Sequence, residues 1–214
     1  YDQPGIHSIC VDPRDKQHIL VGVSCGGVWR TTDGGTTWSG ATKGMVATYM
    51  PPEKAEEPAV QDPHRIVRCP SQPDALWVQH HCGIFRTVDN AQTWTSATGM
   101  APSSFGFGVA VHPTQPDTAW FVPAVRDEAR YPVDAKLVVT QTTDGGATSR
   151  GLNNGLPTAP SYDLVYRHAL DIDASGQRLA FGSTTGRLWT TADGGQQWQP
   201  LDAGLPPIAA VGVG

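Results

Sequence analysis

Lysine and arginine are scarce in this chain of 214 residues, and they are spread thinly along it. Fifteen basic residues stand against 20 acidic ones, which gives a formal net charge of −5. A nucleic-acid surface needs clustered basic residues to neutralise phosphates, so we expect no nucleic-acid partner. Only 16% of the residues are charged, but seven Trp, five Tyr and five Phe supply core material, which argues against a disordered chain.

Long apolar runs and paired cysteines are also missing. No stretch approaches the roughly 20 apolar residues that a membrane-spanning helix needs, so we expect no membrane partner. The four cysteines have neither CxxC nor zinc-ribbon spacing. They favour free thiols in a reducing compartment, and hence a cytoplasmic location. The absence of G-x-S-x-G, phosphate-loop and dinucleotide motifs disfavours a serine hydrolase and predicts no nucleotide or organic cofactor.

What the chain does contain is a repeated box. Its four copies are TTDGGTTW (31–38), TVDNAQTW (87–94), TTDGGATS (142–149) and TADGGQQW (191–198). Their aspartates, which recur every 49 to 56 residues, are Asp33, Asp89, Asp144 and Asp193. Such a segment suits a tight turn, because glycine tolerates positive φ and the carboxylate can accept backbone N–H groups. We therefore expect a structural role for these four aspartates.

Short β-rich runs surround every box. In the first repeat, IHSICV, HILVGV and GVWR precede the box, and a fourth run follows it. Four such runs per repeat without a helical period predict an all-β fold, a β-propeller of four-stranded antiparallel blades. We expect one partial propeller over 1–214, with blades at about 5–42, 62–99, 104–152 and 163–202 and the inner strand of a further blade at 208–213.

An arc of four blades leaves strand edges and blade faces uncovered. Uncovered edges and apolar faces favour association with another surface. We therefore expect self-association rather than an unusually small closed ring.

The box pattern [ST]-x-D-x-G-x-x-W resembles the Asp-box, or BNR repeat, of sialidases, sortilin-like receptors and many bacterial propellers. Two copies are complete, whereas Ala91 replaces the glycine of the second and Ser149 the tryptophan of the third. Stretches such as PHRIVRCPSQPDALWVQHHCGIFRT resemble, over nearly the whole chain, a bacterial family described as WD40/YVTN/BNR-like or glycosyl hydrolase-like. The resemblance implies a bacterial propeller and the C-terminal portion of a longer member, but fold alone does not define a reaction.

Histidines fall in one column of the repeat. Aligning the ends of the four first runs places His7, His64, Phe107 and His168 at equivalent positions, and the loop of the second repeat adds His80 and His81. First strands line the axis of a propeller, so these five imidazoles are expected at one end of the channel. Such a set can bind a divalent metal such as Zn, Mn or Fe. Alternatively, the histidines bind only channel water and neighbouring backbone.

Two insertions, at 43–62 and 123–135, border the same end, where loops on a rigid scaffold often contact substrate. We expect metal-assisted hydrolysis of an ester, phosphoester or glycoside. The catalytic candidates are Glu53, Asp127 and Arg65. The candidates for binding a small-molecule or glycan ligand are Phe107, Arg126, Tyr131 and Arg167.

Two other functions stay open at this point. Sialidase chemistry needs an arginine cluster, a tyrosine nucleophile and acidic partners. Arg65, Arg167 and several tyrosines are available, but no Arg-Ile-Pro-type segment is present. The other alternative is a non-catalytic propeller for binding or assembly, as in the sortilin-like and photosystem-assembly Asp-box proteins.

Overall fold

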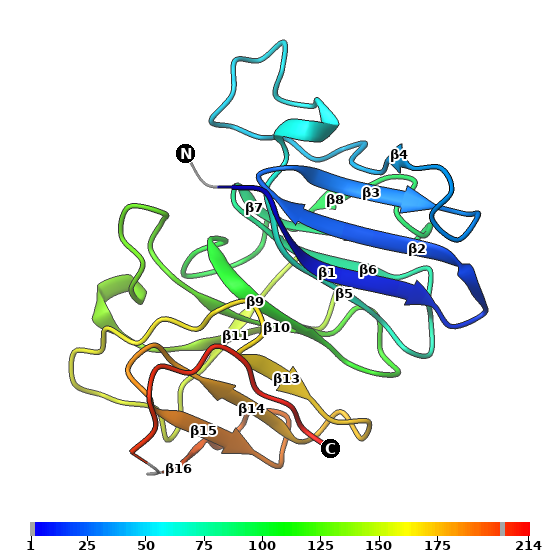
Figure 1. The fold of residues 1–214 in the computed structure, drawn as a ribbon. Helices are drawn as coiled ribbons and strands as arrows, with labels where there is room; N and C mark the ends of the chain where they lie inside the picture. The colour runs from blue at the N-terminus through cyan, green and yellow to red at the C-terminus, as the bar shows by residue number, and fades with distance from the viewer. Residues whose placement is uncertain (1–2, 202–203) are drawn as a thin grey trace.

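The structure is a computed structural model, and it describes residues 3–201 and 204–214. Its strands form four antiparallel sheets of four strands, arranged around a common axis (Figure 1). The predicted all-β propeller architecture is confirmed. The predicted end of the fourth blade, Asp202, lies outside the described residues. Among the described residues, no helix has the length and apolar character needed to cross a bilayer.

Each sheet is a meander whose strands follow one another in sequence. The first two blades comprise β1 (Gly5–Asp12), β2 (Asp15–Ser24), β3 (Gly27–Thr31) and β4 (Ser39–Gly40), then β5 (Pro63–Arg68), β6 (Leu76–His80), β7 (Gly83–Thr87) and β8 (Thr95–Ser96). The last two comprise β9 (Gly106–Val111), β10 (Ala119–Pro123), β11 (Val139–Thr142) and β12 (Arg150–Leu152), then β13 (Leu170–Ile172), β14 (Leu179–Gly182), β15 (Leu188–Thr191) and β16 (Gln199–Leu201). The first strands are neighbours in the order β1, β5, β9, β13.

The boxes form the turns between the third and fourth strands. In the second blade, Asp89 accepts hydrogen bonds from the Thr87 hydroxyl (2.7 Å) and from the N–H and hydroxyl of Thr93 (2.9 and 2.6 Å). The other three aspartates accept corresponding bonds from their own boxes. Ala91 occupies the glycine position with φ 62°, a left-handed conformation that costs alanine more than glycine. The turn thus forms in the incomplete second box as well.

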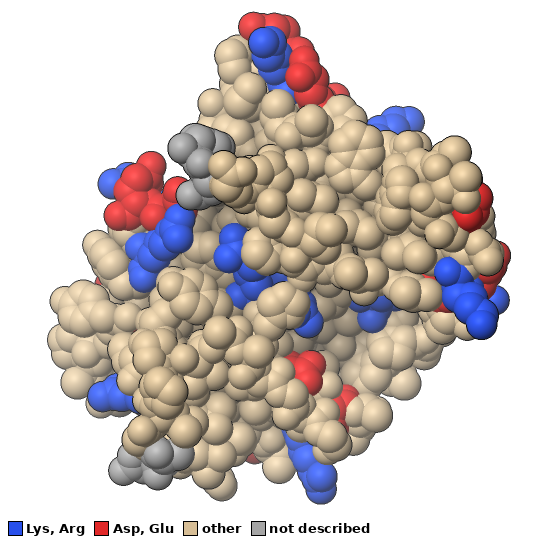
Figure 2. Space-filling model, in the orientation of Figure 1, with Lys and Arg blue, Asp and Glu red and all other residues tan. Residues whose placement is uncertain are grey.

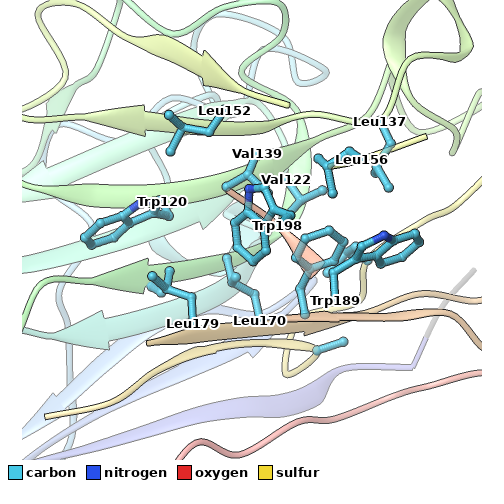
Figure 3. Packing of buried hydrophobic residues seen from close by; sticks show 14 residues of the cluster. Trp120, Val122, Leu137, Val139, Leu152, Leu156, Leu170, Leu179, Trp189 and Trp198 are labelled. Carbon is cyan, nitrogen blue, oxygen red and sulfur yellow. The ribbon is translucent and has the colours of Figure 1, made fainter. Parts of the chain in front are cut away.

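Apolar side chains are packed mainly between neighbouring blades. Three buried clusters join the first blade to the second, the second to the third and the third to the fourth. Figure 3 shows the last of these, with Val139 and Leu152 on one side, Leu170 and Leu179 on the other, and Trp198 between them. Burial of these faces is the main apolar stabilisation of the arc.

The last residue of the box connects blades 2, 3 and 4 to the blade before. The backbone N–H of Trp94 donates to the carbonyl of Lys43, and the backbone N–H of Trp198 donates to the carbonyl of Asn154. In the third blade, the hydroxyl of Ser149 takes the place of the indole and donates to the carbonyl of Gly99 at 2.7 Å. Trp38 belongs to the first blade and is 44% exposed, whereas Trp94 is 4% exposed. The face of blade 1 that carries Trp38 is therefore uncovered.

A glycine of the preceding blade lies against the backbone of each of the two buried tryptophans, Trp94 and Trp198. A Cβ at Gly44 would overlap the carbonyl of Trp94, and one at Gly155 would overlap that of Trp198; both glycines have positive φ. At the corresponding Gly204, no described heavy atom lies within 4 Å of that position. The outer face of blade 4 is thus open where the other blades are covered.

Residues 208–213 form no regular strand. They lie beside β13, where His168 and Ala210 form a single parallel bridge and the N–H of Val211 donates to the carbonyl of His168. The long loop between β4 and β5 projects at the top of Figure 1 and contains the short helix η1 (Pro58–Val60). The loop between β10 and β11 contains η2 (Val133–Ala135).

Candidate functional site

Asp62 is the centre of a polar cluster at the end of the channel where the first strands begin. It directly precedes β5. Its Oδ1 accepts hydrogen bonds from the hydroxyl of Ser24 (2.7 Å) and the N–H of Cys25 (2.9 Å). Its Oδ2 faces Nδ1 of His81 at 3.3 Å and Nε2 of His64 at 3.6 Å. The first blade therefore holds one carboxylate oxygen, and the other is directed at two imidazoles.

His64 is buried on β5 and is oriented by the third blade. Its ring stacks on that of Phe107, with centroids 4.5 Å apart and planes 18° apart. Its Nδ1 lies 2.7 Å from the carbonyl oxygen of Gly106. Because a carbonyl only accepts, Nδ1 carries a proton, and Nε2 is the nitrogen on the side of Asp62.

His81 follows β6 and completes the cluster. Its backbone N–H donates to the carbonyl of Asp62 at 2.9 Å, which fixes the loop against the start of β5. Its ring makes edge contacts with Tyr49 and Phe105, at centroid distances of 5.2 and 5.7 Å. The hydrogen bond to Asp62 raises the pKa of His81, although burial acts in the opposite direction.

The Asp62 carboxyl is ionised at neutral pH. Burial opposes its ionisation, but hydrogen bonds with His64 and His81 and from Ser24 lower its pKa far below the usual range. A charged carboxylate beside two imidazoles supplies both the charge and the lone pairs that a cation requires.

The three side chains have the spacing of metal ligands. One ligand atom each from Asp62, His64 and His81 lies within 4.8 Å of the others, and of the residues described this is the one such group of three found. Ligands about 2.0–2.2 Å from one ion stand at comparable separations. The second nitrogen of His64 and the second oxygen of Asp62 are already hydrogen-bonded, as is common for metal ligands. Two imidazoles and one carboxylate leave positions open for water and substrate. These residues therefore fit a divalent metal.

A cavity of about 560 Å³ opens beside the cluster. Cys25, Tyr49, Asp62, His81 and Asp127 contribute to its lining. Asp127 is held by Arg130, which donates to its Oδ1 from Nε and Nη2 at 2.9 and 2.5 Å. The two insertions thus supply walls of this cavity, and Asp127 supplies a second carboxylate.

His7 and Arg167 lie near the cluster. Burial lowers the pKa of His7, and the charge of Arg167 lowers it further, while the charge of Asp62 acts in the opposite direction. His7 is therefore neutral at pH 7 and able to accept a proton. The guanidinium of Arg167 lies 5.3 Å from the ring centroid of Phe107, and its Nη2 is 3.4 Å from the hydroxyl of Ser24.

His80 does not join the cluster, in contrast to the expectation that it is a metal ligand. It is fully buried, and the backbone amides of Asp62 and Cys82 face its ring nitrogens at 2.9 and 3.0 Å. Burial lowers its pKa to about 3. A neutral His80 therefore ties the loop to the strand, and its neighbour His81 is the residue that faces Asp62.

Among the described residues, four other candidates make no direct contact with the cluster, although Arg126 lines a further cavity together with His81. His168 is exposed, and its backbone is bridged to Ala210. Glu53 is exposed on the projecting loop. Arg126 is exposed and paired with Glu128 (3.5 Å), and the ring of Tyr131 contacts that of Tyr162 (5.9 Å). No contact of these four with Asp62, His64 or His81 occurs in the described structure.

Arg65 follows His64 on β5 and lines a second cavity, of about 560 Å³, on the axis between the first strands of all four blades. Burial lowers its pKa, and the charge of Asp171 acts in the opposite direction. Arg65 lies deeper in the channel than the cluster of Asp62, His64 and His81.

Sequence reasoning did not select Asp62 as a site residue. The available signal was its position, two residues before His64 and immediately before a first strand, where a side chain reaches the mouth of the channel. This position is easily overlooked because Asp62 is also the last residue of the insertion 43–62. Ser24 and Phe105, which support the site, carried no comparable signal.

No protein-family model matches this chain, and no curated protein matches it. Several solved structures do. An ancestral GH74 enzyme has a TM-score of 0.67 and 16% identity, over 92% of this chain and 24% of that one. The GH74 xyloglucanase from Xanthomonas campestris has a TM-score of 0.64 and 17% identity, over 94% of this chain and 30% of that one.

YCF48 from Cyanidioschyzon merolae has a TM-score of 0.61 and 17% identity, over 98% of this chain and 60% of that one. This chain thus spans less than two thirds of each of these three proteins. At such identities the likeness concerns the fold: all of them share the arrangement of blades described above.

Proposed function

We propose that Asp62, His64 and His81 bind one divalent metal ion and that the protein is a metal-assisted hydrolase. The observation that carries this proposal is the orientation of the three side chains. Hydrogen bonds to Ser24 and to Gly106 hold the outer oxygen of Asp62 and the outer nitrogen of His64. The remaining ligand atoms face one another at the edge of a cavity.

When bound, Zn, Mn or Fe supplies Lewis acidity to a water molecule and to an ester, phosphoester or glycosidic oxygen. Asp127 lines the same cavity and is a candidate to accept the proton of the attacking water. Its bonds with Arg130 fix its position and use only Oδ1. Neutral His7, close to Asp62 and Arg167, is the second candidate base.

The ligand proposed for the cavity is a small molecule or a glycan. Tyr49 and Phe105 form an aromatic border around His81, which suits the flat face of a sugar or an aromatic ester. Two of the similar structures are GH74 enzymes, one of them a xyloglucanase, so a glycoside belongs among the first substrates to test.

Elemental analysis of the purified protein, after incubation with Zn, Mn or Fe and desalting, tests the metal site. We expect about one ion per chain, with loss of that ion in the double variant H64A/H81A and in Asp62→Asn. His18→Ala is the matched control, because His18 is a half-exposed histidine at the other end of the strands, with its Nε2 3.8 Å from Oδ2 of Asp15. Full metal content in H64A/H81A would refute the proposed site.

Activity is assayed on nitrophenyl acetate, nitrophenyl phosphate, nitrophenyl glycosides and xyloglucan. The metal-loaded protein should hydrolyse at least one of them, and D127N should lower the rate without lowering metal content. If metal binds but every substrate is left intact, the hydrolase proposal fails, and the alternative of a non-catalytic binding module takes its place.

A further inference from the structure

Two arginines near the axis make no ion pair with any carboxylate that the structure describes. The Nε atoms of four arginines are buried without an acceptor; they are Arg65, Arg68, Arg86 and Arg167. Arg68 and Arg86 compensate through their terminal nitrogens, which pair with Asp12 and Asp117. In the described structure, Arg65 and Arg167 make no ion pair. Both side chains are half-buried, and a partly desolvated cation without a paired anion is costly, so each position favours a source of negative charge.

The surroundings of these two arginines differ. Arg65 faces the axial cavity, where the charge of Asp171 acts on it. Arg167 stands at the mouth of the channel over Phe107, the ring that also stacks on His64. Its one hydrogen bond, 3.4 Å long, donates to the Ser24 hydroxyl. The guanidinium of Arg130 lies 5.4 Å from the same ring. Two cations thus converge on Phe107, beside the proposed metal ligands.

Basic side chains gather in the middle of this face. Figure 2 shows Lys and Arg atoms along the hollow that crosses it, with acidic atoms at its left end and below its middle. Asp127 offsets Arg130, and Asp62 is the remaining carboxylate close to Arg167. Asp62 makes no ion pair with Arg167 in the described structure, because its oxygens face Ser24, His64 and His81.

We propose that Arg167 binds an anionic group of the substrate, a phosphate or a carboxylate, next to the metal-binding cluster. A planar guanidinium offers two parallel N–H donors, which match either group. The guanidinium lies over the ring of Phe107, and the Ser24 hydroxyl connects Arg167 to Asp62, one of the proposed metal ligands. That the anion belongs to a substrate rests on the proposed function, but anion binding itself is testable without a metal.

The test is equilibrium binding of inorganic phosphate, and separately of acetate, to the metal-free protein at low ionic strength. We expect saturable binding of at least one anion, a loss of tenfold or more in affinity in R167Q, and a smaller loss in R167K, since lysine keeps the charge but not the fork. Arg178→Gln is the matched control, because Arg178 is exposed and makes no ion pair in the described structure. Near-ultraviolet circular dichroism verifies that each variant is folded.

The outcomes separate the two proposals. Binding of phosphate but not acetate assigns a phosphoester substrate, and the reverse assigns a carboxylate. Unchanged affinity in R167Q, or no saturable binding by the original protein, overturns the anion site. The variant H64A/H81A should keep its anion affinity while it loses metal. If no metal binds to the original protein but R167Q still loses anion affinity, the hydrolase proposal fails and the anion site stands.

Discussion

The Nδ1 atom of His64 donates a hydrogen bond across a blade boundary to the carbonyl oxygen of Gly106, over 2.7 Å. This bond selects the tautomer of His64, and with it the nitrogen that faces Asp62. Gly106 has little room for a side chain, because a Cβ there would stand 2.8 Å from the carbonyl oxygen of Val122. The chemistry offered by the second blade therefore depends on main chain of the third.

Acid should destabilise the protein through His80. Burial lowers its pKa to about 3, so between pH 6.5 and pH 3 the imidazole is protonated in the unfolded chain but neutral in the native state. The free energy of unfolding contributed by this group is complete above pH 6.5 and falls as the pH drops towards 3. Urea unfolding at pH 7, 6, 5 and 4 measures it. His80→Asn should flatten the dependence, whereas an equally steep curve in that variant would contradict this role.

His81 should act in the opposite direction. Its pKa is raised by Asp62, so the protonated pair stabilises the native state fully below pH 6.5, and this stabilisation is lost as the pH rises through the raised value. We expect His81→Asn to remove a decline of stability on the alkaline side of pH 6.5. Titration of the ring by NMR gives a direct measurement, and a pKa at or below 6.5 would disagree with the ion pair.

Asp89→Ala should destabilise the chain by about 1–3 kcal/mol, since it leaves the hydroxyls of Thr87 and Thr93 and a turn N–H without their acceptor. Chemical denaturation gives the change. Val88→Thr is the control, because Val88 is the exposed neighbour within the same box and should alter stability little. Equal midpoints for the two variants would show that the turn does not need the carboxylate.

Trp94 and Trp38 should differ sharply although they hold the same position in their boxes. Trp94 is buried against the first blade and donates from its indole to the carbonyl of Ala41, so Trp94→Ala should cost about 3–5 kcal/mol. Trp38 is 44% exposed, and Trp38→Ala should cost much less in the monomer. Unfolding followed by circular dichroism at low protein concentration compares them. Similar losses would mean that Trp38 has a partner in solution even at that concentration.

We expect the chain to self-associate through its uncovered blade faces. Trp38 lies on one such face and Gly204 on the other. Between blades 1 and 2 the equivalent residues, Trp94 and Gly44, are in contact. A head-to-tail contact would join the two. Light scattering over a range of concentrations should show species larger than a monomer, reduced in Trp38→Ser but not in the control Tyr162→Ser, which alters an exposed tyrosine elsewhere. A monomer at the highest soluble concentration would exclude this contact.

The repeat made the fold predictable, because a box and three β-rich runs recur with nearly constant spacing. The same alignment placed His7 and His64 at one end of the channel, where the structure has them. It did not extend to His168. There β13 begins only at Leu170, and the backbone of His168 is engaged by residues of the C-terminal tail, so the column ends before the fourth blade.

His80 and His81 differ although they are neighbours in sequence. His80 is the last residue of β6 and His81 begins the turn that follows, so nothing in the sequence required both side chains to face the same metal. The orientation of the Asp62 carboxylate was not predictable from the sequence. It depends on hydrogen bonds from Ser24 and Cys25, which are distant in sequence and contact Asp62 only after the blades have packed.

The packing of each blade mainly on its neighbours in sequence gives the chain the energetics of a one-dimensional array. Stability in such an array is a sum over units and nearest-neighbour contacts, so the units with one neighbour are the first to open. Blades 1 and 4 should therefore exchange their amide protons sooner than blades 2 and 3. The three residues proposed to bind a metal lie just before β5, on β5 and just after β6, and the residues that support them belong to blades 1 and 3. Fraying of blade 1 would release Asp62 from Ser24 and Cys25 while His64 kept its bond to Gly106, so partial opening would loosen the ligand set before the interior melts.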